Sequence, residues 1–441
     1  MKLYDTLTGE KREFVPLTRD VVKMYVCGVT PYSSTHVGHA LSYVVFDVLR
    51  RYLELLGYRV EHVQNFTDVE DKIILHAQQR KVSPEALTGE FIEDYFAGMD
   101  ALNVMRATRY PLATQEIPRM LELIARLIDE GYAYAADGSV YFRVEKAVGY
   151  GSLSHRSLEG MMAGARVEPG QGKEHPMDFA LWKAAKPGEP AWDSPWGKGR
   201  PGWHIECSAM ALAYLGETID IHGGGQDLIF PHHENEAAQS ESYTHKRPFA
   251  RFWVHNGLLQ LGSEKMSKSL GNLVTLKDAL AHHSADALRL FFLSSYYRAP
   301  LTYTEEAVEA MERGVERLRT ALRDAPASSG AHLDAAEYRQ RFLAALDDDL
   351  NTPQASAALF DLAREINHAR DDGMDVSAAQ QTLRELGGML GLTLKARESK
   401  DAVAAEPFIQ LLIETRKELR AARQYALADA IRNKLAALGV A

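Results

Sequence analysis

The stretch "DVVKMYVCGVTPY", residues 20–32, decides the fold. It contains a dense run of apolar, β-favouring residues, Val21–Val26, and then turns to glycine and proline. Such a run predicts a buried strand that ends in a turn. The following stretch, "STHVGHALSYVVFDVLRRYLELLG" (34–57), repeats apolar residues at helical spacing, and Ser34 or Thr35 can cap its start. The sequence therefore predicts a strand followed directly by a helix.

A second strand follows in "YRVEHVQNFTD", residues 58–68. Strand, helix and strand in this order form a right-handed parallel unit, the beginning of a nucleotide-binding sheet. A later stretch, "LGETIDIHGGGQDL" (215–228), alternates as a strand does and then places three glycines at its carboxyl end. Ligands bind at this end of open parallel sheets. We predict an α/β fold with a Rossmann-like parallel sheet.

The rest of the chain divides by composition. We predict a sheet domain over residues 1–300, interrupted by an insertion at about 110–200 that contains a hairpin at "AADGSVYFRV" (135–144). Amphipathic helical patterns follow and predict an α-helical bundle over 301–395. After a linker, charged helices form a small C-terminal region over 406–441.

Composition sets further limits. The chain has 441 residues and a formal net charge of −10, which does not favour nucleic-acid binding, although a local basic face can still bind phosphate. The start, "MKLYDTLTGEKREF", is not a signal peptide, and no apolar run approaches the ~20 residues that a membrane helix needs. We expect a cytoplasmic protein.

The chain has only two cysteines, Cys27 and Cys207. A single distant pair in a cytoplasmic chain does not favour a disulfide. The two are either buried, inert thiols or half of a four-ligand metal site. The stretch "FPHHENEAAQSE" (230–241) leaves a similar choice, because its His and Glu residues suit either a metal site or a polar helix start on the surface.

Two motifs suit phosphate. In "THVGHA" (35–40), His36 and His39 lie at the opening of the first predicted helix. The free N–H groups of a helix start favour phosphate, two imidazoles can donate to its oxygens, and Gly38 permits close approach to the backbone. By itself this motif is short.

The second motif is "KMSKS" (265–269), in which Lys265 and Lys268 flank a serine, within a segment bracketed by Gly262 and Gly271. A glycine-bounded loop with two ammonium groups can close over a polyphosphate. The alternative is a solvated basic loop.

Together these two motifs resemble the signatures of class I aminoacyl-tRNA synthetases. The segments "YVCG", "NFTDVEDK", "GWHIECSAM", "HGGGQDLIFPHHENE" and "KMSKSLGN" are similar to the cysteinyl-tRNA synthetase family of bacterial type, and the likeness covers nearly the whole chain. The resemblance implies ATP-dependent ligation of L-cysteine to tRNA(Cys) through a cysteinyl adenylate.

The resemblance also implies one zinc ion per chain, bound by Cys27, Cys207, His232 and Glu236, which recognises the cysteine thiol. The spacing agrees, because His232 and Glu236 lie four residues apart and share one helix face. His233 would point about 100° away from that face. We place it beside the ligands or on the phosphate side.

Other roles follow from the resemblance alone. The expected amino-acid pocket contains Thr67 and Trp203, although Trp203 could instead be a packed core aromatic. Gly223–Gly225 would lie against adenosine, and Asp227 would bond the ribose or merely cap a turn. The expected catalytic residues are His36, His39, Lys265 and Lys268, with magnesium on ATP. The expected ATP-binding residues are His36, Gly38, His39, Gly224, Asp227 and Lys268.

The RNA-facing part depends on the C-terminal helix. Arg416, Arg420 and Arg423 form one stripe that suits backbone phosphates, or equally a solvated, salt-bridged helix. The chain ends at "AALGVA", whereas bacterial relatives usually continue into a short aromatic-containing tail. Either the tail is absent or the anticodon is contacted differently. We expect a monomer.

Two alternatives remain. The cysteine ligase of mycothiol synthesis resembles the chain equally in fold, zinc and signatures, but joins cysteine to glucosaminyl-inositol. Glu236 and the long C-terminal extension count against it. The other alternative is a non-catalytic nucleotide- and zinc-binding paralogue, but such proteins tend to lose a signature lysine or histidine, and the chain retains all four.

Overall fold

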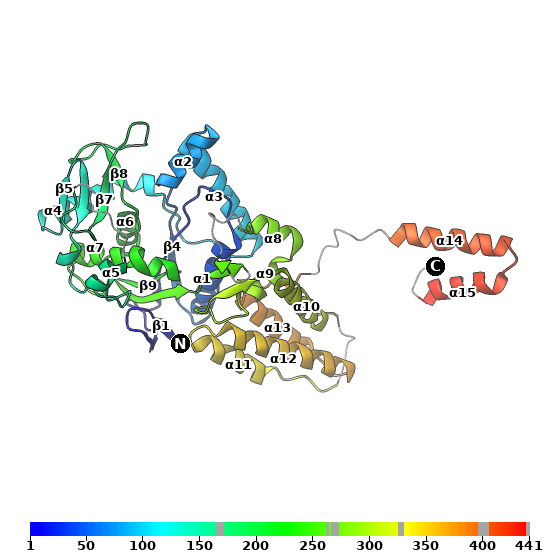
Figure 1. Cartoon of the computed structure of the whole chain (residues 1–441). Helices are drawn as coiled ribbons and strands as arrows, with labels where there is room; N and C mark the ends of the chain where they lie inside the picture. The colour runs from blue at the N-terminus through cyan, green and yellow to red at the C-terminus, as the bar shows by residue number, and fades with distance from the viewer. Residues whose placement is uncertain (165–171, 262–263, 266–272, 325–329, 396–404, 438–441) are drawn as a thin grey trace. The chain divides into compact units, whose positions relative to one another are not determined.

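The chain forms two compact units, Met1–Leu394 and Lys395–Ala441, which are described separately. The structure is a computed structural model (Figure 1). It describes residues 1–164, 172–261, 264–265, 273–324, 330–395 and 405–437.

The first unit is built on a four-stranded parallel sheet in the order β10-β9-β3-β4. The strand β3 pairs with β4 in register from Val21 with Arg59 to Val26 with Gln64. The predicted α/β class and parallel sheet are therefore confirmed. The strands are β3 (Val21–Val26), β4 (Arg59–Gln64), β9 (Ile219–Gly225) and β10 (Ala250–Asn256).

The helix α1 (Val37–Leu55) connects β3 to β4 and buries the apolar residues that predicted it. Its start differs from the prediction, because neither Ser34 nor Thr35 caps it. The N-cap is His36, whose Nδ1 accepts a hydrogen bond from the backbone N–H of His39 at 3.2 Å. An imidazole thus does here the work that a hydroxyl usually does.

The insertion forms a four-stranded antiparallel sheet in the order β5-β6-β7-β8. The predicted hairpin is confirmed as β5 and β6, joined at Asp137 and Gly138, which both have positive φ. Strands β7 and β8 were not predicted, since a Pro- and Gly-rich stretch separates them and β8 has only three residues. Figure 1 shows this sheet and the helical bundle on opposite sides of the parallel sheet. The strands are β5 (Ala133–Ala136), β6 (Ser139–Phe142), β7 (Phe179–Ala184) and β8 (Gly199–Pro201).

Further helices lie before, within and after the insertion. They are α2 (Asp71–Arg80), α3 (Pro84–Ala101), α4 (Ile117–Asp129), α5 (Leu158–Gly164), α6 (Trp203–Leu215) and α7 (Glu234–Thr244). Two smaller sheets complete the strands: β1 (Lys2–Asp5) with β2 (Glu10–Glu13), and β11 (Leu259–Leu261) with β12 (Glu264–Lys265) and β13 (Leu301–Tyr303).

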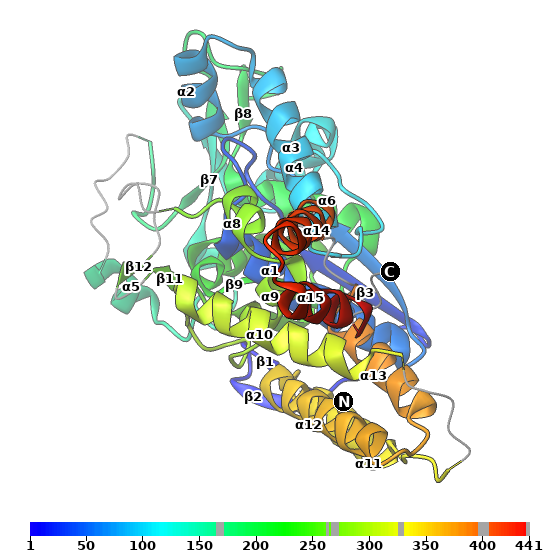
Figure 2. The same cartoon turned by 90° about the vertical axis from the view of Figure 1, so that its right-hand side faces the viewer.

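The predicted helices after the sheet are present and lie alongside one another (Figure 2). One hydrophobic core runs from Leu3 to Leu394 and joins α1 to these helices. A buried ion pair lies in it, with an Arg289 nitrogen 2.5 Å from an Asp47 carboxylate oxygen. The helices within the predicted range are α10 (Glu305–Ala321), α11 (Ala336–Asp347), α12 (Thr352–Asp371) and α13 (Ser377–Met389). Two helices that were not predicted precede them, α8 (Leu276–His282) and α9 (Ala285–Phe292).

The second unit is a pair of helices, α14 (Ala405–Ala421) and α15 (Tyr425–Ala437). Arg420 is exposed on α14, whereas Arg423 lies beyond the end of that helix with positive φ, so it does not continue the predicted stripe of Arg416 and Arg420. The role of this helix toward RNA stays a prediction, as do the domain boundaries. Within the described parts of both units, no helix is long and apolar enough to cross a membrane.

Candidate metal and nucleotide site

The site gathers at the carboxyl ends of the parallel strands. Cys27 and Gly28 directly follow β3, and Asn65 directly follows β4. A Cβ atom at Gly28 would lie 1.5 Å from the backbone oxygen of Asn65, so only glycine permits this approach. The two strand ends are therefore held together in a fixed arrangement.

A fully buried group of possible metal ligands lies below these strand ends. Cys27, Cys207, His232 and Glu236 each offer one ligand atom, and these atoms all lie within 4.8 Å of one another. They come from the end of β3, from α6, and from the turn that leads into α7 together with α7 itself. The four residues predicted as zinc ligands are thus brought together.

Two of the three distances are close to those expected around a small tetrahedral ion. The Cys27 Sγ lies 3.9 Å from the Cys207 Sγ and 3.6 Å from a Glu236 oxygen. Zinc bond lengths imply separations of about 3.3–3.8 Å between tetrahedral ligand atoms. The His232 Nε2 lies 2.9 Å from Glu236 Oε1, which is a hydrogen-bond distance. Two thiols, one imidazole and one carboxylate form a donor set that zinc accepts.

The helix α7, which carries Glu236, begins later than the sequence suggests, so that His232 precedes it. Phe230 keeps extended backbone angles (φ −138°, ψ 132°), and α7 begins only at Glu234. A short turn, Ile229–His233, leads into it. His232 and Glu236 nevertheless face each other, as their spacing predicted.

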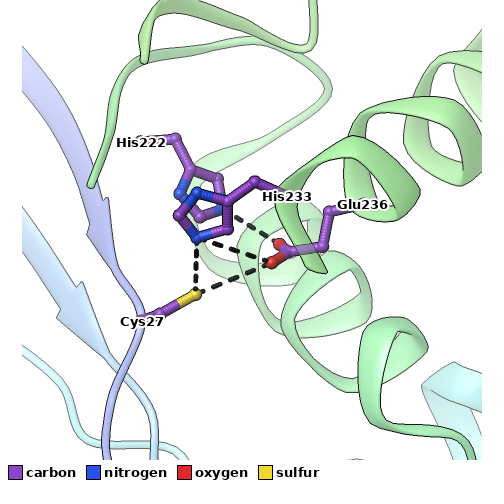
Figure 3. A group of neighbouring side chains, drawn as sticks. All are labelled: Cys27, His222, His233 and Glu236. Atoms are coloured by element: carbon purple, nitrogen blue, oxygen red, sulfur yellow. Dashed lines mark hydrogen bonds and ion pairs between the residues drawn. The ribbon is translucent and has the colours of Figure 1, made fainter. Parts of the chain in front are cut away.

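A second group overlaps the first and consists of Cys27, His222, His233 and Glu236 (Figure 3). His233 Nε2 lies 3.2 Å from the Cys27 Sγ, and His222 Nε2 lies 2.9 Å from Glu236 Oε2. His233 in turn contacts His255 at 2.7 Å. His233 thus reaches the same Cys27 and Glu236 side chains as the predicted ligands and does not point away from them, because Ile229–His233 is not a regular α-helical turn.

Sequence reasoning missed His222 and His255. His222 is the middle residue of β9 and directly precedes its three glycines, and His255 is the last residue but one of β10. That position was the available signal, because ligands gather at this edge.

Charges in this buried group balance one another. The hydrogen bond from Cys27 lowers the pKa of Cys207 to about 6. Although burial raises the pKa of Glu236, His222 and His232 lower it to about 2. Burial lowers the pKa of His232, but the charges of Glu236 and Cys207 raise it to about 10. Near neutral pH the group thus pairs the anionic Glu236 with a cationic His232, and burial raises the pKa of the Cys27 thiol well above its ordinary value. Cys27 and His232 must therefore each lose a proton before they can bind a cation.

A cavity of about 620 Å³ opens above this group. Cys27 lines this cavity, whereas the other members of the ligand group, Cys207, His232 and Glu236, do not. Trp203 also lines the cavity, is 39% exposed, and stacks on His232 with ring centroids 4.2 Å apart. Trp203 is thus not a packed core aromatic.

The predicted phosphate-binding residues line the same cavity. The rings of His36 and His39 stack with centroids 3.6 Å apart. A Cβ atom at Gly38 would lie 3.0 Å from the His36 ring, so Gly38 leaves room for the capping imidazole. Asp227 lines the cavity as well.

Two residues predicted at the site lie outside the described cavity lining. Gly224 lies against neighbouring side chains, since a Cβ atom there would come within 2.8 Å of Leu228 and 2.9 Å of His233. Thr67 is buried behind the strand ends and accepts a hydrogen bond from Asn65. Nothing is described of the Lys265 side chain, and Lys268 lies outside the described residues.

The sequence and the fold match known proteins. Residues 13–313 match the family described as tRNA synthetases class I (C) catalytic domain, and residues 341–395 match the DALR domain. A solved structure of methionyl-tRNA synthetase from Mycobacterium tuberculosis has the same fold, with a TM-score of 0.62 at 17% identity over 84% of this chain and 89% of that one. These matches define the class, the class I aminoacyl-tRNA synthetases.

More similar relatives narrow the class. A cysteine–tRNA ligase of Dehalococcoides mccartyi is 59% identical over all of this chain and 96% of its own length. One from Caldicellulosiruptor saccharolyticus is 51% identical over all of this chain and 97% of its own length. The chain belongs to the cysteine–tRNA ligase family. The resemblance drawn from the signature motifs is thereby confirmed.

Proposed function

We propose that this protein ligates L-cysteine to tRNA(Cys) in two ATP-dependent steps. The carboxylate of cysteine attacks the α-phosphorus of ATP and releases pyrophosphate, which gives cysteinyl adenylate. The 2′-hydroxyl of the terminal ribose of the tRNA then attacks the activated carbonyl and releases AMP. The observation that carries the proposal is Cys27, which belongs to the buried ligand group and also lines the cavity that contains His36 and His39.

The ligands that we propose for one zinc ion are Cys27, Cys207, His232 and Glu236. This set contains two thiols, which zinc prefers to the extra imidazoles of the overlapping group. When bound, zinc would take the substrate thiolate as a further ligand and so select sulfur. In this arrangement His222 orients the Glu236 carboxylate, and the His233 imidazole lies against the Cys27 sulfur.

The chain's own residues handle the phosphates. Because His36 Nδ1 accepts the N–H of His39, the proton of the neutral ring lies on Nε2, which can donate to a phosphate oxygen. The start of α1 adds its partial positive charge. Lys265 and Lys268 would stabilise the charge on departing pyrophosphate, with magnesium carried on ATP. No side chain becomes a covalent intermediate, so catalysis consists of positioning and charge stabilisation.

The amino acid and the adenosine take the remaining positions. Trp203 would form a wall of the amino-acid pocket above His232. Thr67, which is buried and follows β4, would bind the amino acid. Asp227 would bond the ribose, while Gly224 would contribute backbone near the adenosine. We further propose that the helices after residue 301 and the C-terminal unit bind tRNA, that the protein acts as a monomer, and that it works in the cytoplasm.

The experiment that tests this proposal has two parts. ATP–pyrophosphate exchange is measured with each amino acid in turn, and cysteine should be the one that supports it. Acylation by [³⁵S]cysteine is then compared with total tRNA and with glucosaminyl-inositol as acceptors. Transfer to the sugar and not to tRNA would replace the proposed function with the mycothiol-type ligase reaction. Exchange with no amino acid would indicate a non-catalytic protein.

A further inference from the structure

We propose that Asn65 is a positioning residue that couples the metal-ligand group to the amino-acid pocket. The inference rests on the proposed function. Asn65 carries no assigned role, follows β4 directly, and is 1% exposed. Its side chain reaches both Thr67 and the segment that holds Cys27.

The first contact fixes the turn after β3. The Asn65 Oδ1 accepts a hydrogen bond from the backbone N–H of Gly28 at 2.9 Å. Gly28 immediately follows Cys27, so this bond fixes the peptide that presents the Cys27 sulfur. The contact also fixes the orientation of the amide, because only its oxygen can accept from an N–H group.

The second contact follows from that orientation. With its oxygen on Gly28, the Asn65 amide directs its NH₂ group to Thr67, and Nδ2 donates to Thr67 Oγ1 at 3.2 Å. Thr67 is also buried, and its backbone N–H donates to the backbone carbonyl oxygen of Val29 at 3.1 Å. Both bonds hold Thr67 in one position.

The third contact reaches the other thiol. The Cys207 Sγ lies 3.8 Å from Asn65 Oδ1. One amide therefore touches a proposed zinc ligand, the residue after another ligand, and a predicted pocket residue. Polar groups that contact metal ligands typically change metal affinity or activity by about 10–100-fold when they are mutated.

Two substitutions separate these contacts. Asn65→Leu keeps the approximate volume and removes every polar contact. Asn65→Asp keeps an oxygen that accepts from Gly28 but loses the donor to Thr67. The matched control is Gln64→Leu, because Gln64 is also a buried amide, one residue earlier, whose side chain donates to Tyr95 instead. Zinc affinity is measured by competition with a chromogenic chelator. The visible absorption spectrum of the cobalt-substituted protein is recorded, and the KM values for cysteine and ATP are measured by ATP–pyrophosphate exchange.

We expect Asn65→Leu to weaken zinc affinity by about 10–100-fold, to change the cobalt spectrum, and to raise the KM for cysteine without raising the KM for ATP. Asn65→Asp should hold zinc more tightly than Asn65→Leu and still raise the KM for cysteine. If Asn65→Leu does not fold, Asn65→Asp is compared with the parent, and a raised KM for cysteine with an unchanged KM for ATP supports the inference.

The inference is overturned if both Asn65 variants match the parent in zinc affinity and in the KM for cysteine. It is equally overturned if Gln64→Leu causes the same changes, because the effect would then come from general loosening of the end of β4. A parent protein that holds no zinc, or that does not exchange with cysteine, would overturn the proposed function instead.

Discussion

The sulfur atoms of Cys27 and Cys207 lie 3.9 Å apart, although 180 residues separate them in the chain. One follows the first strand of the parallel sheet, and the other lies in α6 after the whole insertion. Both are buried, and both are within reach of His232 and Glu236. The two cysteines of the chain thus meet in one group of side chains that could hold a metal ion.

Cys207→Ser should remove most of the zinc from a protein that otherwise holds one ion per chain. The reason is that the proposed set loses a soft thiolate and keeps only three strong ligands. Zinc is measured by elemental analysis after washing with a mild chelator. His222→Gln should have a smaller effect, about 10–100-fold in affinity, because His222 only orients Glu236. Full zinc retention in Cys207→Ser, with loss in His222→Gln, would instead assign the ion to the overlapping group.

His232→Asn should weaken discrimination between cysteine and serine. Serine is smaller than cysteine, so a steric wall cannot exclude it, and a pocket alone separates near-isosteres by only about 10–200-fold. A hydroxyl is also a poorer zinc ligand than a thiolate. The measurement compares cysteine- and serine-dependent pyrophosphate exchange in parent and variant, with deacylation of seryl-tRNA alongside. Unchanged discrimination at reduced zinc content, or rapid clearance of seryl-tRNA by the parent, would place the selectivity elsewhere.

Lys268→Ala should mainly slow adenylate formation, by roughly 10²–10³-fold, by analogy with the loss of an oxyanion donor. Lys268 belongs to the signature loop predicted from the sequence, and its ammonium group would act on charge that develops in the transition state. Single-turnover adenylation is measured together with the affinity for cysteine. A large loss of cysteine affinity at a normal adenylation rate would contradict this assignment.

Arg289→Met should destabilise the protein by about 3 kcal/mol, the lower end of the range for breaking a buried ion pair. Arg289 is fully buried and pairs with Asp47, which retains Arg51 at 2.8 Å in the variant. The control is Arg59→Met, which removes a largely exposed pair with Glu61 and should cost at most about 1 kcal/mol. Urea unfolding followed by tryptophan fluorescence gives both values, and equal effects would refute the prediction.

The ion pair between Asp47 and Arg289 also predicts that the protein loses stability as the pH falls into the acid range. Burial raises the pKa of Asp47, but the charges of Arg289 and Arg51 lower it below its ordinary value. A lowered folded-state pKa contributes stability that is present above the unfolded pKa of about 3.9 and is lost as pH falls through the folded value. Parent and Asp47→Asn should therefore differ most near neutral pH and converge below about pH 4 in urea midpoints. A difference that persists unchanged into acid would exclude this linkage.

Local pattern predicted much of the fold. The run Val21–Val26 is β3 residue for residue, and the apolar spacing of 34–57 gave α1. Such segments are readable because each buries one continuous set of side chains whose spacing matches a single backbone geometry. The sequence did not predict strands β7 and β8, since strands within a Pro- and Gly-rich insertion depend on partners that are distant in sequence.

The sequence alone determined which residue types are available at the site: two cysteines, the His–His–Glu run, and the two phosphate motifs. Only the tertiary structure decided that His222 and His233 contact Glu236 and Cys27, that His36 caps its own helix, and that Asn65 bridges Gly28 and Thr67. The physical reason is that the parallel sheet brings the ends of β3, β4 and β9 to one edge. Contacts across that edge depend on register and close backbone approach, neither of which any single segment encodes.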